Sequence, residues 1–419
     1  MRLKILSSLL YQRTSENEWV VHSGLLLLIL VGFAQALIGQ RVKAVKVLSQ
    51  VHRTSRSQWM RQLVETYIRA NRDAVHADLL PSVSPNITTL FGNRLMVLKA
   101  PAPEGEKGVL LVMFTEMIRL LHSSMNLPQL LQDYTLVFEP SWSGYCHPEF
   151  LQFTHFSEEI FVLAAEENDF AFLQRLGSNL IPVDLGPCDW VDPRVAAPYL
   201  PNSKEFDIVM NSNWAAWKRH YVLFRMLARA KQRYKVVLIG VKWAGKTAGD
   251  IETLADFYGV RGQITILERL SYEKVMDVNC RSKVSILLSL KEGSNRAIAE
   301  SVFCNVPVVV LSSHVGGIRK NIVPQTGVLT DERHLESAIG GLLCSSLRPR
   351  EWAMKNISCF ISSDKLNARL REHALRKGRP WTKEIAGRSN SPESKYICDA
   401  DAEHLRPWNQ GLANYLRRV

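Results

Sequence analysis

The chain has 419 residues, of which 46% are hydrophobic, and a formal net charge of +12. This length and apolar content are sufficient for two domains with separate cores. The positive charge favours an anionic partner, either a nucleotide diphosphate or an acidic membrane surface. The sequence contains no Arg/Gly-rich arm, zinc finger or aromatic RNA-binding signature, so we do not expect nucleic acid as a partner. Seven cysteines without a Cys-x-x-Cys pair indicate a reducing compartment and argue against zinc.

An apolar segment lies near the N-terminus, where no charged residue occurs between Glu18 and Arg41. The segment is barely long enough to span a bilayer, and the basic residues after it would leave the rest of the protein in the cytoplasm. Ala34-Gln35-Ala36 also has the form of a secretory cleavage site, but the positive charge behind it disfavours secretion. A membrane anchor and a buried core helix both remain open.

The first half changes from helical to strand patterns at residue 95. We expect residues 1–94 to form the apolar segment and a basic helical region, and residues 95–200 to form a Rossmann-like domain of alternating strands and helices. The stretch Asp192–Ser203 contains three prolines and is the predicted boundary between the halves.

The second half is more regular. Residues 204–345 alternate apolar strands with helices, which predicts a doubly wound parallel sheet with its ligand at the carboxyl ends of the strands. Residues 346–419 form a basic tail, whose helices we expect to pack on the first domain.

The most informative run follows the predicted strand Val284–Leu288. It contains Glu292 in a Glu-Gly-Ser-Asn loop, then Glu300 one turn into a helix, and a second buried strand at Pro307–Leu311. Backbone N–H groups at a helix N-terminus bind phosphate, and carboxylates accept hydrogen bonds from sugar hydroxyls. The run therefore predicts a ligand that is part phosphate and part polyol.

With its flanking strands, this Glu-x7-Glu run resembles the signature of the retaining glycosyltransferases of family 4 (glycosyl transferases group 1). The resemblance covers about Phe206 to Leu343. It implies the α/β GT-B fold, in which two Rossmann-like domains face each other across a cleft. It also implies transfer of a sugar from a nucleotide-diphosphate-sugar donor with retention of configuration.

Residue roles carried over from this resemblance lie mostly in the second half. The catalytic candidate is Glu292, which would face sugar hydroxyls, and Glu300 would hold the ribose. The family's Gly-Arg pair after the first strand is missing here, since Asn211, Ser212 and Asn213 occupy its place. The complete set of donor-binding candidates is Lys218, Arg219, Gly240, Gly293, Ser294, Asn295 and Glu300.

The acceptor side is less well marked, because the Gly-rich loop that often follows the family's first strand is absent. The loop at 139–147 is polar and aromatic, and its candidates are Glu139, Trp142 and Tyr145. The resemblance implies neither a metal nor a cofactor. The apolar segment and the basic charge suggest a glycan or lipid-linked acceptor in polysaccharide biosynthesis, at the cytoplasmic face of a membrane.

Two alternatives remain open. Gly240–Thr247 matches the Gly-x4-Gly-Lys-Thr phosphate loop of NTPases, in which Lys246 would reach the β/γ oxygens and Thr247 would bind magnesium. However, Trp243 is bulky for such a loop, and no later strand ends in an aspartate that could hold the metal. The missing Arg and Gly-rich loop also allow a degenerate GT-B scaffold without catalysis.

Overall fold

The computed structural model describes residues 2–74, 94–102, 105–142, 144–196 and 204–417. It contains two compact units, and each is built from separate stretches of the chain. The first, called the C-terminal unit here, consists of Met1–Asn17 and Val191–Ser358; the second, the N-terminal unit, consists of Glu18–Trp190 and Cys359–Val419.

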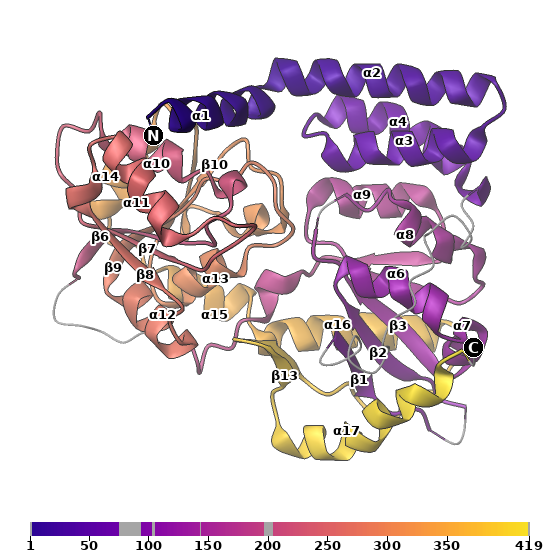
Figure 1. The fold of residues 1–419 in the computed structure, drawn as a ribbon. Coiled ribbons are helices and arrows are strands. Elements are labelled where there is room, and N and C mark those ends of the chain that lie inside the picture. The colour runs from indigo at the N-terminus through magenta and orange to yellow at the C-terminus, as the bar shows by residue number, and fades with distance from the viewer. Residues whose placement is uncertain (1, 75–93, 103–104, 143, 197–203, 418–419) are drawn as a thin grey trace. The chain divides into compact units, whose positions relative to one another are not determined.

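The C-terminal unit is built on a six-stranded sheet (Figure 1). Its strands are β6 (Phe206–Asn211), β7 (Val236–Gly240), β8 (Ile264–Glu268), β9 (Ser282–Leu287), β10 (Val308–Leu311) and β11 (Gly327–Thr330). All neighbouring pairs are parallel, in the order β11-β10-β9-β6-β7-β8. β7 and β10 are short apolar runs that are buried throughout, as expected of strands in a parallel sheet covered on both faces.

Strand order fixes where a ligand can bind. The chain runs from β6 outward to β8, then returns to β9 beside β6 and continues to β11 on the other side. In doubly wound sheets a ligand binds outside the carboxyl ends of the strands at this reversal. The loops after β6 and β9 are therefore the expected site.

Helices cover the sheet of the C-terminal unit. They are α10 (His220–Leu227), α11 (Ala248–Phe257), α12 (Tyr272–Cys280), α13 (Arg296–Phe303), α14 (Leu335–Leu343) and α15 (Pro349–Asn356). The N-terminal helix α1 (Arg2–Glu16) also belongs to this unit, since Leu9 is buried in its core and Gln12 Nε2 donates to the Ala216 carbonyl at 2.6 Å. Sequence reasoning placed α1 with the region up to residue 94 because it weighed only neighbours in the chain.

The N-terminal unit contains a five-stranded sheet in sequential order. Its strands are β1 (Leu95–Lys99), β2 (Gly108–Met113), β3 (Tyr134–Glu139), β4 (Ile160–Leu163) and β5 (Leu180–Val183). The pairs from β2 to β5 are parallel, whereas β1 runs antiparallel to β2. The short connection between Lys99 and Gly108 explains this difference, because parallel neighbours need a long crossover.

Both the N-terminal helices and the C-terminal tail pack in this unit. The helices before β1 are α2 (Glu18–Leu37), α3 (Arg41–Thr54) and α4 (Gln58–Ala70), which lie side by side in Figure 1. Between the strands are α6 (Thr115–Ser124), α7 (Leu127–Asp133), α8 (Pro148–Leu151) and α9 (Glu167–Leu176). The tail forms α16 (Cys359–Arg376), the hairpin β12 (Arg388–Asn390) and β13 (Ser394–Tyr396), and α17 (Asp399–Gly411).

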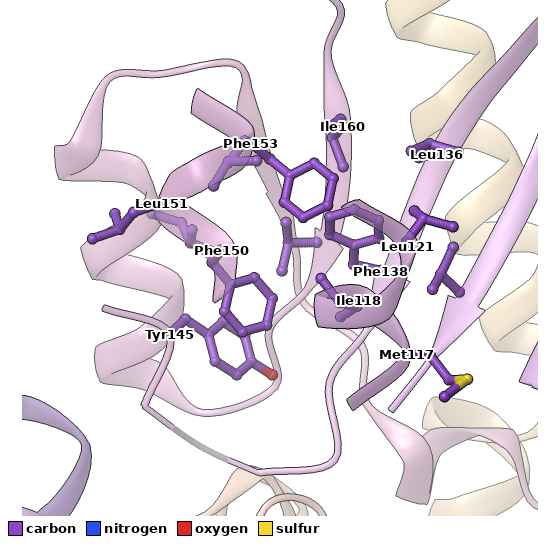
Figure 2. Packing of buried hydrophobic residues seen from close by; sticks show 14 of the residues in the cluster. Met117, Ile118, Leu121, Leu136, Phe138, Tyr145, Phe150, Leu151, Phe153 and Ile160 are labelled. Atoms are coloured by element: carbon purple, nitrogen blue, oxygen red, sulfur yellow. The ribbon is translucent and has the colours of Figure 1, made fainter. Parts of the chain in front are cut away.

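The core of the N-terminal unit has an aromatic centre. Phe138 of β3 packs edge-on against Phe153, with ring centroids 4.8 Å apart, and Tyr145 stacks on Phe150 (Figure 2). The tail contributes to the other side of the sheet through Leu366 and Leu370 of α16. From Cys359 onward the tail belongs to this compact unit.

The chain passes from one unit to the other at Asn17/Glu18, at Trp190/Val191 and at Ser358/Cys359. The expected boundary segment Asp192–Ser203 begins just after the second of these junctions, and its residues 197–203 lie outside the described residues. The tail is therefore divided, because α15 packs beside α13 in the C-terminal unit while α16 packs in the other.

Candidate active site

A buried ion pair lies at the strand-order reversal of the C-terminal unit. Lys218 ends the short 3-10 helix Ala216–Lys218 after β6, and Glu292 lies in the loop after β9. Lys218 Nζ donates to Glu292 Oε1 at 2.7 Å, and each residue is only 7% exposed. Sequence reasoning chose these two residues separately. The structure brings them together at the position where doubly wound sheets bind ligands.

Two further side chains orient the Glu292 carboxylate. Ser289 Oγ donates to Oε1 at 2.5 Å, and Asn295 Nδ2 donates to Oε2 at 2.9 Å. An ionised carboxylate has about four acceptor sites, and these three donors hold it in a fixed orientation. The arrangement presents a fixed, negatively charged acceptor next to a fixed ammonium group.

The N-terminus of α13 adjoins the carboxylate. Asn295 is the N-cap, and its Oδ1 accepts from the Ile298 N–H at 3.0 Å while its Nδ2 holds Glu292. The helix dipole and the N–H groups of the first turn favour a phosphate here. Gly293 and Ser294 immediately precede this cap, so the structure places all four residues of the Glu-Gly-Ser-Asn loop in one location.

Sequence reasoning missed His314, which anchors the same loop from the turn after β10. Its Nδ1–H donates to the Ser289 carbonyl at 2.8 Å, and burial lowers the pKa of the imidazole, which keeps it neutral. A side chain on Gly316 would come within 2.9 Å of the Glu292 carbonyl, so only glycine allows this approach. His314 could have been identified from the sequence by its position just beyond the carboxyl end of the strand that follows Glu300.

Glu300 lies in the second turn of α13 and is 3% exposed. Burial raises the pKa of its carboxyl, opposed by Arg296 and by the hydroxyl of Tyr272. Arg296 Nε lies 3.0 Å from Glu300 Oε1 and begins the same helix. The ribose role of Glu300 stays a prediction, and any ribose must compete with Arg296 for this carboxylate.

Arg219 has a left-handed backbone, with φ of 63°. Its guanidinium donates to Glu16 at 2.9 Å, to Glu332 and to the Leu288 carbonyl at 3.1 Å. Burial acts to lower the pKa of Arg219, but the nearby Glu16, Tyr221 and Glu332 raise it overall. Two carboxylates therefore neutralise the guanidinium, which leaves Lys218 as the cation that faces Glu292.

Gly240 at the end of β7 allows close packing. A Cβ there would lie 2.5 Å from the Ser212 carbonyl and 2.6 Å from the Trp214 ring. Trp214 is itself fixed by a hydrogen bond from its indole N–H to Glu268. Close packing therefore explains why position 240 is glycine, without any contact to a ligand.

The Gly240–Thr247 segment does not have the open backbone of a phosphate-binding loop. It forms a tight turn in which Trp243 and Lys246 exchange backbone hydrogen bonds, with Ala244 and Gly245 at positive φ. The Thr247 hydroxyl donates to Asp250 at 3.0 Å in a capping box, so it is already engaged. Lys246 is exposed, 3.8 Å from Asp250. This geometry does not favour the NTPase alternative.

The acceptor-side candidates lie in the N-terminal unit. Glu139, at the end of β3, is buried and paired with the buried Arg388 of β12. Tyr145 is buried, and its hydroxyl donates to the Leu163 carbonyl at 3.0 Å (Figure 2 shows its ring against Phe150). Trp142 is 41% exposed. Of the three, Trp142 alone presents its ring to solvent.

Within the described part of the chain, no three His, Cys, Asp or Glu side chains are grouped closely enough to hold a metal ion. The group at Glu292 consists instead of an ammonium, a hydroxyl, an amide and one carboxylate. This set of donors and acceptors suits an organic anion with hydroxyl groups better than a cation.

Residues 193–346 match the family model described as Glycosyl transferases group 1. The match spans the Lys218–Glu292 site and Glu300, and it supports a glycosyltransferase. No curated protein matches the chain.

The likeness to one solved structure supports the predicted fold. Sucrose-phosphate synthase from Thermosynechococcus elongatus is similar with a TM-score of 0.51 and 17% identity, covering 64% of this chain and 74% of that one. Anabaena HepE in complex with UDP and glucose has a TM-score of 0.48 and 13% identity, covering 62% of this chain and 78% of its own. The GT-B fold class with an N-terminal apolar helix is confirmed.

Proposed function

We propose that this protein transfers a sugar from a nucleotide-diphosphate-sugar donor to a glycan or lipid-linked acceptor, with retention of configuration. The observation that carries this proposal is the buried Lys218–Glu292 pair at the strand-order reversal. The group 1 family match over the same residues supports it. The donor side is assigned to the C-terminal unit and the acceptor side to the N-terminal unit.

Each group of the site has a role in this reaction. The diphosphate lies at the N-terminus of α13, and Lys218 neutralises the charge that develops on it as the glycosidic C–O bond breaks. Glu292 accepts hydrogen bonds from the sugar hydroxyls, and Glu300 accepts from the ribose. The acceptor hydroxyl oxygen forms the new bond to the same carbon, and its proton passes to a donor phosphate oxygen. No metal and no enzyme nucleophile are needed in this scheme.

The missing Gly-Arg pair makes Lys218 more important here. Asn213 occupies the region where the family has arginine, and Arg219 is neutralised by Glu16 and Glu332. A single ammonium then supports the leaving diphosphate, which predicts a slow transferase or one with a very restricted acceptor. The same observation favours the second candidate, a GT-B scaffold without catalysis.

Turnover with a panel of nucleotide sugars tests the proposal. Release of a nucleoside diphosphate, with a product whose anomeric configuration by NMR equals that of the donor, supports retaining transfer. Lys218→Ala should abolish it, whereas Lys246→Ala, in the exposed turn, should not. ATP turnover that is lost in Lys246→Ala would contradict the proposal. Absence of any turnover, combined with normal behaviour of Glu292→Ala in cells, would favour the scaffold.

We also infer that the protein works in the cytoplasm, at the inner face of a membrane and in polysaccharide biosynthesis. Support comes from the net charge of +12 and from α2, the one helix among the described residues that is long and apolar enough to cross a membrane. Fractionation of cells tests this. Full-length protein that stays wholly in the soluble fraction would contradict it.

A further inference from the structure

Helix α2 has two apolar faces with different surroundings. Leu25, Ile29 and Gly32 recur at helical spacing and are buried. Gly32 lies so close to α3 that a Cβ on it would come within 2.6 Å of Leu48. This face is a genuine part of the core of the N-terminal unit, which also contains Val45 and Leu48 of α3.

The opposite face of α2 is apolar and exposed. Leu27 is 62% exposed and Leu30 is 67% exposed. The exposed large apolar residues from this helix and its end are Trp19, Val20, Leu26, Leu27, Leu28, Leu30, Val31, Leu37 and Ile38. A patch of this size on a soluble surface marks a surface that binds something apolar.

The geometry argues that α2 does not span a bilayer. Helix α3 follows after only Gly39 and Gln40 and packs along α2, and it carries the exposed cations Arg41, Lys43 and Lys46. If α2 crossed a membrane in this arrangement, α3 would enter the hydrocarbon with those charges, which is strongly unfavourable.

Helix α4 fixes the same bundle to the body of the unit. Arg61 of α4 pairs with Glu166 at 3.3 Å, and Glu65 pairs with Arg175 of α9 at 2.7 Å. The α4 member of each pair is buried, so the bundle of α2, α3 and α4 cannot separate from the rest of the unit without exposing these charges. Helix α2 is therefore held parallel to the surface of a folded domain.

We propose that α2 lies in the plane of an anionic lipid surface, with the face that carries Leu27 and Leu30 buried among the acyl chains. The exposed face consists of aliphatic side chains with Trp19 at one end, and Arg41 follows at the other, within reach of lipid headgroups. Protein interfaces instead combine apolar groups with hydrogen-bonding side chains, and the middle of this face has few of them. The inference does not rest on the donor site, which belongs to the other unit.

Vesicle sedimentation of the full chain tests the lipid surface. Wild-type protein should sediment with phosphatidylcholine vesicles that contain phosphatidylglycerol, and less with phosphatidylcholine alone. Leu27→Glu and Leu30→Glu should each weaken this binding on the order of tenfold. Leu375→Glu is the matched control, because Leu375 is 58% exposed on α16 of the same unit, and it should bind as the wild type does.

Equal sedimentation of Leu27→Glu and wild type would overturn the proposal, as would wild-type protein that never sediments. A wild-type dimer that Leu27→Glu converts to monomer, without any binding to vesicles, would assign the face to a second copy instead. Circular dichroism and nucleotide binding of each variant show that it is folded. Because nucleotide binding is measured in solution, failure of the lipid inference and failure of the donor-site proposal give different results.

Labelling distinguishes an in-plane helix from a span. In a Cys344→Ser, Cys398→Ser background, which removes the exposed thiols, Glu18→Cys and Gln40→Cys report the two ends of α2. In sealed, cytoplasmic-face-out membrane vesicles from expressing cells, an impermeant maleimide should label both ends. Labelling of one end alone would overturn the in-plane arrangement in favour of a span.

Discussion

Substitution of Lys218 by methionine should affect both the stability of the C-terminal unit and its affinity for a nucleoside diphosphate. The Lys218–Glu292 pair is buried with an N–O distance of 2.7 Å. Loss of one partner from such a pair costs about 3–5 kcal/mol. Since Ser289 and Asn295 still donate to the carboxylate, we expect about 2–3 kcal/mol here, or a fall of about 4–12 °C in Tm.

A double-mutant cycle isolates this interaction. Lys218→Met and Glu292→Gln each remove one partner, and urea unfolding of the two single variants and the double variant gives the coupling free energy. We expect a coupling of about 2 kcal/mol, because the second substitution costs little once the first has been made. Lys246→Met is the matched control, since this lysine is exposed and 3.8 Å from its partner, and it should cost less than about 0.5 kcal/mol.

The ligand gives the second readout. Lys218→Met should weaken binding of the preferred nucleoside diphosphate about 10- to 100-fold, as expected for loss of one charge-assisted contact. If the losses of unfolding free energy in the two single variants add up to the loss in the double variant within about 0.5 kcal/mol, the buried pair as described is refuted. A coupled pair with unchanged nucleotide affinity would refute its role in donor binding and leave it a purely structural feature.

Three other predictions follow from particular side chains. Glu300→Gln should lower the affinity for a nucleoside diphosphate and remove most of the preference for it over its 3′-deoxyribose analogue; an unchanged preference would argue against a ribose contact. Arg388→Met should destabilise the protein by about 3–5 kcal/mol in urea unfolding, because it leaves Glu139 buried without its guanidinium, whereas Arg371→Met on the surface should cost less than about 1 kcal/mol. Burial and then Lys218 lower the pKa of His220 to about 3. Below about pH 6.5 the unfolded chain therefore binds a proton that the folded chain does not bind. The free energy of unfolding should fall by about 3 kcal/mol between pH 6.5 and pH 4, and His220→Gln should reduce this loss.

The sequence predicted best those elements that are fully buried or that follow one another directly in the chain. The expected strand Pro307–Leu311 corresponds to β10 within one residue, since fully buried parallel strands are continuous apolar runs. The Glu-Gly-Ser-Asn loop was also found, because strand, loop and helix follow one another in the chain. The short connection between β1 and β2 could have predicted that these strands are antiparallel. The alternation of strands and helices alone does not give strand direction.

Contacts between distant residues could not be predicted from the sequence. Glu16 lies 203 positions from Arg219, and nothing in the composition of α1 shows that it packs on the C-terminal unit. Arg388 likewise reaches Glu139 across 249 positions, which converts a candidate sugar-binding carboxylate into a buried ion pair. The sequence alone does not show which residue of opposite charge a charged residue will pair with.

Calorimetric titration of the wild-type chain with UDP, GDP, ADP and CDP, each with and without EDTA, tests the central claim most directly. We expect one of these nucleotides to bind at one site per chain, with an affinity that EDTA and Lys246→Ala leave unchanged and that Lys218→Met weakens. Binding by none of the four, or binding that requires a divalent metal and Lys246, would contradict a glycosyltransferase donor site at Lys218 and Glu292.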